Sequence, residues 1–265
     1  MLTAVFAALL IVTATTVTAP EAMAATKKVV IVVGPVGGQT ASYRDSANRL
    51  ADQARSYGAA VTKVYTPNAT WSRVYAAAKG ANVLIYLGHG NGWPSPYAPF
   101  STTSKDGMGL NRALSGGNSN TRYYGEYYMA RLQLAPNAVV LLHRLCYASG
   151  NSEWGAGNPT KSTAIKRVDN YGAGFLKSGA KAVFASGITS VGYVLRGLFK
   201  GDPATRMSKL FWLDPARSGD RDFTFTSVRT TGATGILDPY APSRYYRSVV
   251  GKLGTTIGNW RAAGG

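Results

Sequence analysis

The chain is poor in cysteine and histidine. Among its 265 residues it has one cysteine, Cys146, and two histidines, His89 and His143. One cysteine cannot form a disulfide within the chain, which excludes a fold held together by disulfides. These side chains and the scattered carboxylates show no ligand spacing typical of a metal site, so we predict neither a metal nor another cofactor. Stability must then come from apolar burial, and a 45% hydrophobic content suits one sizeable domain.

Acidic residues are also scarce. Twelve Asp and Glu stand against 29 Lys and Arg, and the formal net charge is +17. Such a charge favours anionic partners, and anionic cell-envelope polymers are a candidate. The basic residues are scattered, with no run of five, and no nucleic-acid recognition motif accompanies them. We therefore predict no specific nucleic-acid partner, and the sequence leaves the oligomeric state open.

The N-terminal segment has the pattern of a signal peptide. An apolar stretch rich in alanine and threonine covers residues 2–17, and Ala22-Met23-Ala24 places small residues where signal peptidase cuts. No Lys or Arg precedes the apolar stretch, which is atypical. The threonines and Pro20 argue against a membrane anchor. We predict a signal peptide over residues 1–25, a single domain over 26–265, and a secreted, extracellular protein.

The remaining sequence alternates strand and helix patterns. Apolar runs predict strands at 28–33, 60–65, 83–87, 138–145 and 180–186. Three- and four-residue apolar spacing predicts helices at 42–57, 70–79 and 162–178. This order predicts an α/β fold, a three-layer αβα sandwich with a mostly parallel sheet. We also expect a long loop over 91–120, two helical pieces within 192–213 and a strand within 223–230. Beyond Asp238 the pattern predicts nothing specific.

The cysteine and one histidine each follow a predicted strand. Val83–Leu87 leads to Gly88-His89-Gly90, and the run from Val139 ends at Cys146. In an open α/β sheet, chemistry lies at the carboxyl ends of the strands, which makes the two residues a candidate thiolate–imidazole pair. A neighbouring imidazole would lower the thiol pKa. The alternative is an inert, buried cysteine. His143 differs from Cys146 in strand parity, and we interpret it as structural.

These motifs resemble the caspase-like fold of cysteine peptidases, the group of caspases, metacaspases, gingipains and separases. The resemblance covers roughly residues 27–190 and rests on Leu84–Gly90 and Val140–Cys146, supported by 43–50, 57–61, 68–70 and 171–183. It implies that Cys146 is the nucleophile and His89 the general acid/base. It also implies an oxyanion hole formed by the N–H groups of Gly90 and Cys146. The Gln-Ala-Cys-x-Gly motif of the caspases proper is absent, which points to the bacterial branches.

Other residues near the cysteine are candidates for substrate binding. Glu153 and Trp154 follow it in sequence, and Glu153 suits a basic substrate side chain. Arg144 shares the strand parity of Cys146 and is a third candidate. The glycine-rich residues 33–40 lack the phosphate-loop pattern, and we interpret them as a turn.

Three functions fit these observations. The first is a secreted cysteine endopeptidase acting on a protein or peptide substrate through Cys146 and His89. The second is a non-catalytic caspase-like domain that binds a cell-envelope partner. The third is an amidase or transpeptidase acting on cell-wall peptides, which would use the same pair.

Overall fold

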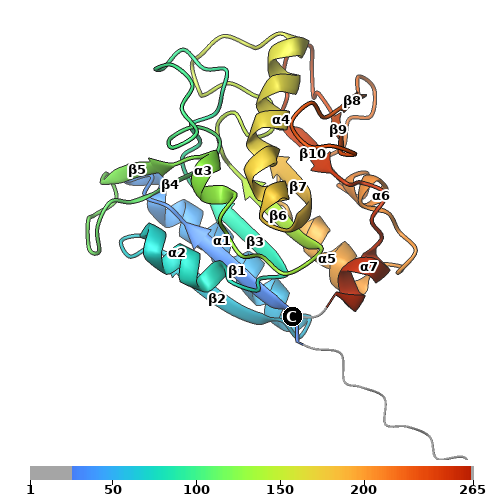
Figure 1. The fold of residues 1–265 in the computed structure, drawn as a ribbon, viewed down its shortest axis with the longest axis horizontal. Coiled ribbons are helices and arrows are strands. Elements are labelled where there is room, and N and C mark those ends of the chain that lie inside the picture. The colour runs from blue at the N-terminus through green and yellow to red at the C-terminus, as the bar shows by residue number, and fades with distance from the viewer. Residues whose placement is uncertain (1–25, 264–265) are drawn as a thin grey trace, which may run out of the picture.

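The computed structural model describes residues 26–263 as two helical layers around one central sheet (Figure 1). The predicted signal peptide lies outside the described residues. The central sheet has eight strands, which are β1 (Lys28–Val33), β2 (Ala60–Tyr65), β3 (Val83–Leu87), β6 (Ala138–His143), β7 (Ala180–Ser186), β8 (Phe223–Thr226), β9 (Thr234–Leu237) and β10 (Arg247–Gly251). Their order across the sheet is β2-β1-β3-β6-β7-β10-β9-β8.

Five of these strands are parallel and three are antiparallel. β2, β1, β3, β6 and β7 run in one direction, while β10, β9 and β8 alternate. β3 and β6 are buried throughout and β1 is buried from Val29 onward, as expected for parallel strands covered on both faces. The prediction of an α/β sandwich with a mostly parallel sheet is confirmed.

Helices cover both faces of the sheet. One face packs against α2 (Trp71–Ala78), α3 (Glu126–Met129) and α4 (Lys161–Lys177). The other packs against α1 (Thr40–Ser56), α5 (Gly192–Lys200), α6 (Met207–Phe211) and α7 (Ile257–Ala262). Strand residues alternate between the two cores: Val30 and Val32 face the first, Val29 and Ile31 the second. No helix among residues 26–263 has the length and apolarity needed to cross a membrane.

Several elements were not expected from the sequence. The loop predicted over 91–120 contains β4 (Met108–Asn111), which pairs with β5 (Thr121–Tyr124) in a separate two-stranded sheet. β9 lies between the strand expected within 223–230 and Asp238, and the unassigned region beyond Asp238 supplies β10 and α7. β9 and β10 are four- and five-residue strands, too short for a clear periodic signal. β10 joins the sheet by pairing with β7, and β9 joins it by pairing with β10 and β8.

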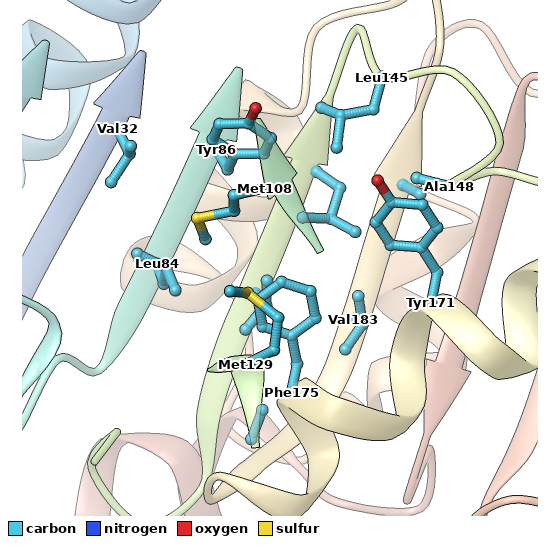
Figure 2. Packing of buried hydrophobic residues seen from close by; sticks show 14 of the residues in the cluster. Val32, Leu84, Tyr86, Met108, Met129, Leu145, Ala148, Tyr171, Phe175 and Val183 are labelled. Atoms are coloured by element: carbon cyan, nitrogen blue, oxygen red, sulfur yellow. The ribbon is translucent and has the colours of Figure 1, made fainter. Parts of the chain in front are cut away.

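A tyrosine at the carboxyl end of β3 links the first core to the edge of the sheet. Figure 2 shows Tyr86 beside Met108 of β4, and Tyr171 of α4 beneath the segment that contains Leu145 and Ala148. Both tyrosines are almost fully buried, with exposed fractions of 0% and 1%. Their hydroxyls find polar partners in the loops above the sheet, as buried hydroxyls require.

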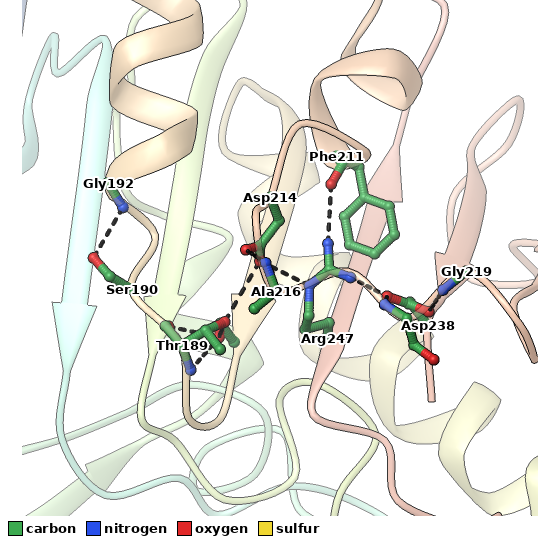
Figure 3. A network of polar contacts seen from close by, with 11 residues as sticks. Thr189, Ser190, Gly192, Phe211, Asp214, Ala216, Gly219, Asp238 and Arg247 are labelled. Carbon is green, nitrogen blue, oxygen red and sulfur yellow. Dashed lines mark hydrogen bonds and ion pairs between the residues drawn. The ribbon is translucent and has the colours of Figure 1, made fainter. Parts of the chain in front are cut away.

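A buried arginine holds together the loops around β10. Figure 3 shows Arg247 between Asp214 and Asp238, and it also donates to the Phe211 carbonyl. Asp214 accepts from the Ala216 N–H, and Asp238 from the N–H groups of residues 218 and 219. The charged atoms are thus fully bonded within the protein, which burial of ions demands.

Replacing this arginine should destabilise the fold. Arg247→Met leaves two buried carboxylates without their counter-ion, and we expect the free energy of unfolding to fall by about 3 to 5 kcal/mol. Urea denaturation measures the change. The control is Arg55→Met, which breaks an exposed pair with Asp52 and should cost less than about 1 kcal/mol. Equal losses in the two variants would contradict the assigned role.

Candidate active site

The strand register brings His89 and Cys146 to the same edge of the sheet. β3 and β6 are adjacent and parallel, and Leu87 lies opposite His143. His89 follows Leu87 by two residues, and Cys146 follows His143 by three. Both residues therefore leave the sheet at its carboxyl edge, from neighbouring strands.

The loop after His89 lies directly against the loop that contains the cysteine. A Cβ at Gly90 would overlap the carbonyl oxygen of Cys146 and come within 2.9 Å of the Tyr171 hydroxyl. Only glycine permits this approach. The N–H groups of Gly90 and Cys146 donate no hydrogen bond to any other part of residues 26–263. Both are available to a bound group.

The backbone on either side of the cysteine is strained. Arg144 and Tyr147 have φ values of 61° and 70°, in the left-handed region that side chains with a Cβ rarely adopt. Each costs about 1 kcal/mol or more. Strain of this kind persists where the surrounding structure enforces it, and it is concentrated at functional sites.

Buried tyrosine and glycine contacts position the histidine backbone. The Tyr86 hydroxyl lies 3.0 Å from the His89 carbonyl oxygen and accepts from the Gly109 N–H at 2.8 Å. A Cβ on Gly109 would come within 3.2 Å of the His89 Cβ. Partial burial lowers the pKa of the imidazole below its ordinary value. The ring is therefore neutral at pH 7 and able to accept a proton.

The thiol is also neutral in the free protein. Burial raises the pKa of Cys146, the Glu153 carboxylate raises it further, and the Trp154 N–H opposes both. The sequence-based expectation that a neighbouring imidazole lowers this pKa is not met, because burial and a negative charge dominate around the sulfur. Both side chains are therefore neutral in the free protein, and Cys146 would need a base to become a thiolate.

A small cavity opens beside these loops. It has a volume of about 230 Å³, and its walls include Gly90, Tyr97, Tyr123, Tyr147 and Glu153. The Tyr97 hydroxyl donates to the Glu153 carboxylate. The Tyr147 hydroxyl is buried and has no hydrogen-bond partner among the described residues. A buried donor without a partner is costly, so a bound group that reaches it would gain a hydrogen bond.

The remaining predicted site residues lie in different places. Trp154 presents its N–H toward the thiol, while its side chain is fully exposed. The Arg144 guanidinium donates to the Ser42 hydroxyl at 3.0 Å and lies 5.4 Å from the Tyr43 ring centroid, which directs it toward α1. His143 is buried within β6, with its Nδ1 unpaired, and burial lowers its pKa to about 4. The structure groups Glu153 with the Gly90 loop and places Arg144 apart from that cavity.

Two buried cations that the sequence analysis missed fasten the loops. Lys105 donates to Asn91, Ser95 and the Tyr97 carbonyl, all within the loop that follows His89. Arg167 joins that loop to the cysteine loop through the carbonyls of Pro94 and Asn151. Both cations donate to neutral oxygens and not to carboxylates. A search of the sequence for ion pairs therefore does not find them.

No bound metal or phosphate is indicated by the described side chains and loops. Residues 26–263 contain no group of three or more His, Cys, Asp or Glu placed to hold a metal ion. In the turn at 33–40, three backbone N–H groups are already hydrogen-bonded within the protein. Gly34 donates to the carbonyl of Leu87, Gly37 to that of Asn118 and Gln39 to that of Val36. In this conformation those donors are not free for a phosphate.

Comparisons with known proteins find distant similarity. No family model matches the chain, and no curated protein matches it. Among solved structures, it is similar to a secreted C11 cysteine protease from Bacteroides thetaiotaomicron in complex with an irreversible peptide inhibitor. The identity is 12%, the coverage 80% of this chain and 66% of that one, and the TM-score 0.39.

The chain is also similar to a flavodoxin of Streptococcus pneumoniae TIGR4, with 16% identity, 58% and 77% coverage and a TM-score of 0.31. When the five parallel strands of the present chain are numbered 1 to 5 in sequence order, their order across the sheet is 2-1-3-4-5, which is the flavodoxin-like order. Similarity at these levels assigns no family and no activity. The function is therefore inferred from the site itself.

The raised thiol pKa predicts how Cys146 reacts in the free protein. Its alkylation rate with iodoacetamide should reach half-maximum at a higher pH than that of free cysteine, because only the thiolate reacts. Glu153→Gln removes one cause of the shift and should move the midpoint downward, raising the rate at pH 7 several-fold. The control Asp52→Asn removes an exposed carboxylate from α1 and should leave the profile unchanged. A wild-type midpoint below that of free cysteine would contradict the neutral pair.

Proposed function

We propose that the protein is a cysteine peptidase of caspase-like fold, with Cys146 as nucleophile and His89 as general acid/base. The observation that carries this proposal is the meeting of the His89-Gly90 and Cys146 loops at the carboxyl ends of adjacent parallel strands. The strained backbone around Cys146 and the two free N–H groups support it.

The proposed chemistry follows from the neutral pair. His89 takes the Cys146 proton as the sulfur attacks the substrate carbonyl carbon. The N–H groups of Gly90 and Cys146 donate to the developing oxyanion. His89 then returns the proton to the leaving amine, and a thioester forms as the C–N bond breaks. Water, deprotonated by His89, hydrolyses the thioester and regenerates the thiol.

We propose that the substrate is a protein or peptide and that Glu153 receives a basic side chain. The 230 Å³ cavity beside Gly90 has the size of a side-chain pocket, and Glu153 and Tyr147 are among its lining residues. The Tyr147 hydroxyl is buried and has no partner among the described residues. Secretion remains a prediction from residues 1–25. It would place the enzyme outside the cell, where its net charge favours anionic polymers as an additional partner.

Loss of either reacting group should abolish turnover. On a panel of fluorogenic peptides, Cys146→Ala and His89→Ala should each lower kcat/KM by at least about 100-fold, because each removes a step of acyl transfer. Thermal unfolding of both variants checks that they remain folded. Iodoacetamide should inactivate the wild type.

The same panel separates the alternative functions. A folded wild-type protein that cleaves no peptide and no protein would support a non-catalytic domain. Turnover confined to cell-wall peptides would support an amidase or transpeptidase.

Selectivity for a basic residue should depend on Glu153. Glu153→Gln should lower kcat/KM for peptides with Lys or Arg before the cleaved bond by about tenfold or more relative to peptides with Ala. The ratio between the substrates cancels any change in the thiol reactivity of the free protein, which affects both substrates equally. The control Asp52→Asn should leave the ratio unchanged. An unchanged ratio in Glu153→Gln would show that the pocket selects no cation.

A further inference from the structure

The cavity beside the cysteine loop belongs to a row of three. Glu153 lines both the 230 Å³ cavity and a second one of about 310 Å³, which also includes Trp154 and Tyr246. Tyr246 in turn lines a third cavity of about 610 Å³. The row follows the carboxyl edge of the sheet from the candidate active site toward β7 and β10.

Hydrogen bonds fix the loops that separate these cavities. The Ser149 hydroxyl donates to the Tyr245 carbonyl at 2.8 Å, joining the cysteine loop to the segment before β10. The Gly187 N–H donates to the Tyr246 carbonyl at 2.8 Å, joining the end of β7 to the same segment. The three loops therefore form one continuous wall.

The third cavity has a buried ionic network on one side and open side chains at its mouth. Arg247 and Asp238 of the network in Figure 3 line it, and the charges of that network are paired within the protein. Ile188 and Tyr240, which are 56% and 68% exposed, stand at the mouth. The exposed charged residues Arg217, Asp220 and Arg221 also line the cavity. Two large apolar side chains left open to water beside a cavity favour an apolar occupant.

We propose that this third cavity binds a large apolar side chain of the substrate, at a position remote from the cleaved bond. The inference rests on the proposed function, since it takes the occupant to be part of the same peptide chain. The enzyme would then select extended polypeptide segments carrying an aromatic or branched apolar residue, in preference to single amino-acid amides.

Strand geometry gives the spacing. Cys146 follows β6, Ile188 follows β7, and Tyr246 precedes β10, so the cavity begins one to two strand positions from the thiol. Neighbouring strands lie about 4.8 Å apart, and an extended peptide advances about 3.3 Å per residue. One to two strand positions span about 5 to 10 Å, so the apolar residue should lie roughly two to three residues from the cleaved bond.

A peptide series tests this proposal. Fluorescein-labelled decapeptides of serine and glycine with one cleavable position carry a single Phe, moved one position at a time. Phe at one position roughly two to three residues from the cleaved bond should raise kcat/KM about tenfold or more over Gly, the gain expected for burying the ring. Ile188→Glu and Tyr240→Glu should remove that gain and leave the peptide without Phe unaffected. Val228→Glu, at an apolar side chain that is 91% exposed and lies outside the three cavities, should retain it.

Binding to Cys146→Ala, measured by fluorescence anisotropy of the same peptides, separates the pocket from catalysis. Phe-dependent binding that both mouth variants abolish supports the proposed role of the cavity. If the wild type nevertheless cleaves no peptide, only the proposed peptidase activity is contradicted. Cleavage with no dependence on Phe at any position contradicts the proposed binding of an apolar side chain in the third cavity. It leaves the proposed peptidase activity supported. A Phe effect that survives in both mouth variants also overturns it.

Discussion

The parallel pairing of β3 with β6 is the interaction on which the site depends. Placing Leu87 opposite His143 brings two short loops out of the sheet side by side, so that Gly90 touches the Cys146 carbonyl. A register shift by one residue would turn the buried strand side chains to the opposite faces, and the two hydrophobic cores hold the strands against such a shift. The apolar packing of both faces thus positions polar groups that contribute nothing to it.

The loops above the sheet are held by buried cations, in a chain with no second cysteine to form a disulfide. Lys105 and Arg167 bind carbonyl and hydroxyl oxygens, and Arg247 binds two carboxylates. Each cation loses hydration on burial, and that cost is offset only while its hydrogen bonds are all made. Such hydrogen bonds require precise geometry, which suits loops that would hold the proposed nucleophile and base in place.

The electrostatics around the thiol oppose its ionisation in the free protein. Burial and Glu153 raise the thiol pKa, and burial lowers that of His89, so both groups are neutral. In the proposed enzyme, a cationic substrate side chain beside Glu153 would offset the carboxylate and ease formation of the thiolate. Reactivity would then increase when substrate is bound, which would limit side reactions of the thiol in the free protein.

The local sequence pattern by itself determined much of the fold of this protein. Apolar runs and helical spacing are enough to place the five parallel strands, their crossover helices and the strand ends at His89 and Cys146, because buried parallel strands carry continuous apolar sequence. Tertiary structure alone decided the rest. The β4–β5 hairpin, β9 and β10 are too short for a clear periodic signal, and β10 joins the sheet by pairing with β7, which is distant in sequence. Arg144 turns toward α1 because its backbone adopts a positive φ, and the thiol pKa rises because burial and Glu153 act on it together. Pairing, burial and charge proximity are properties of the folded chain, and no local pattern encodes them.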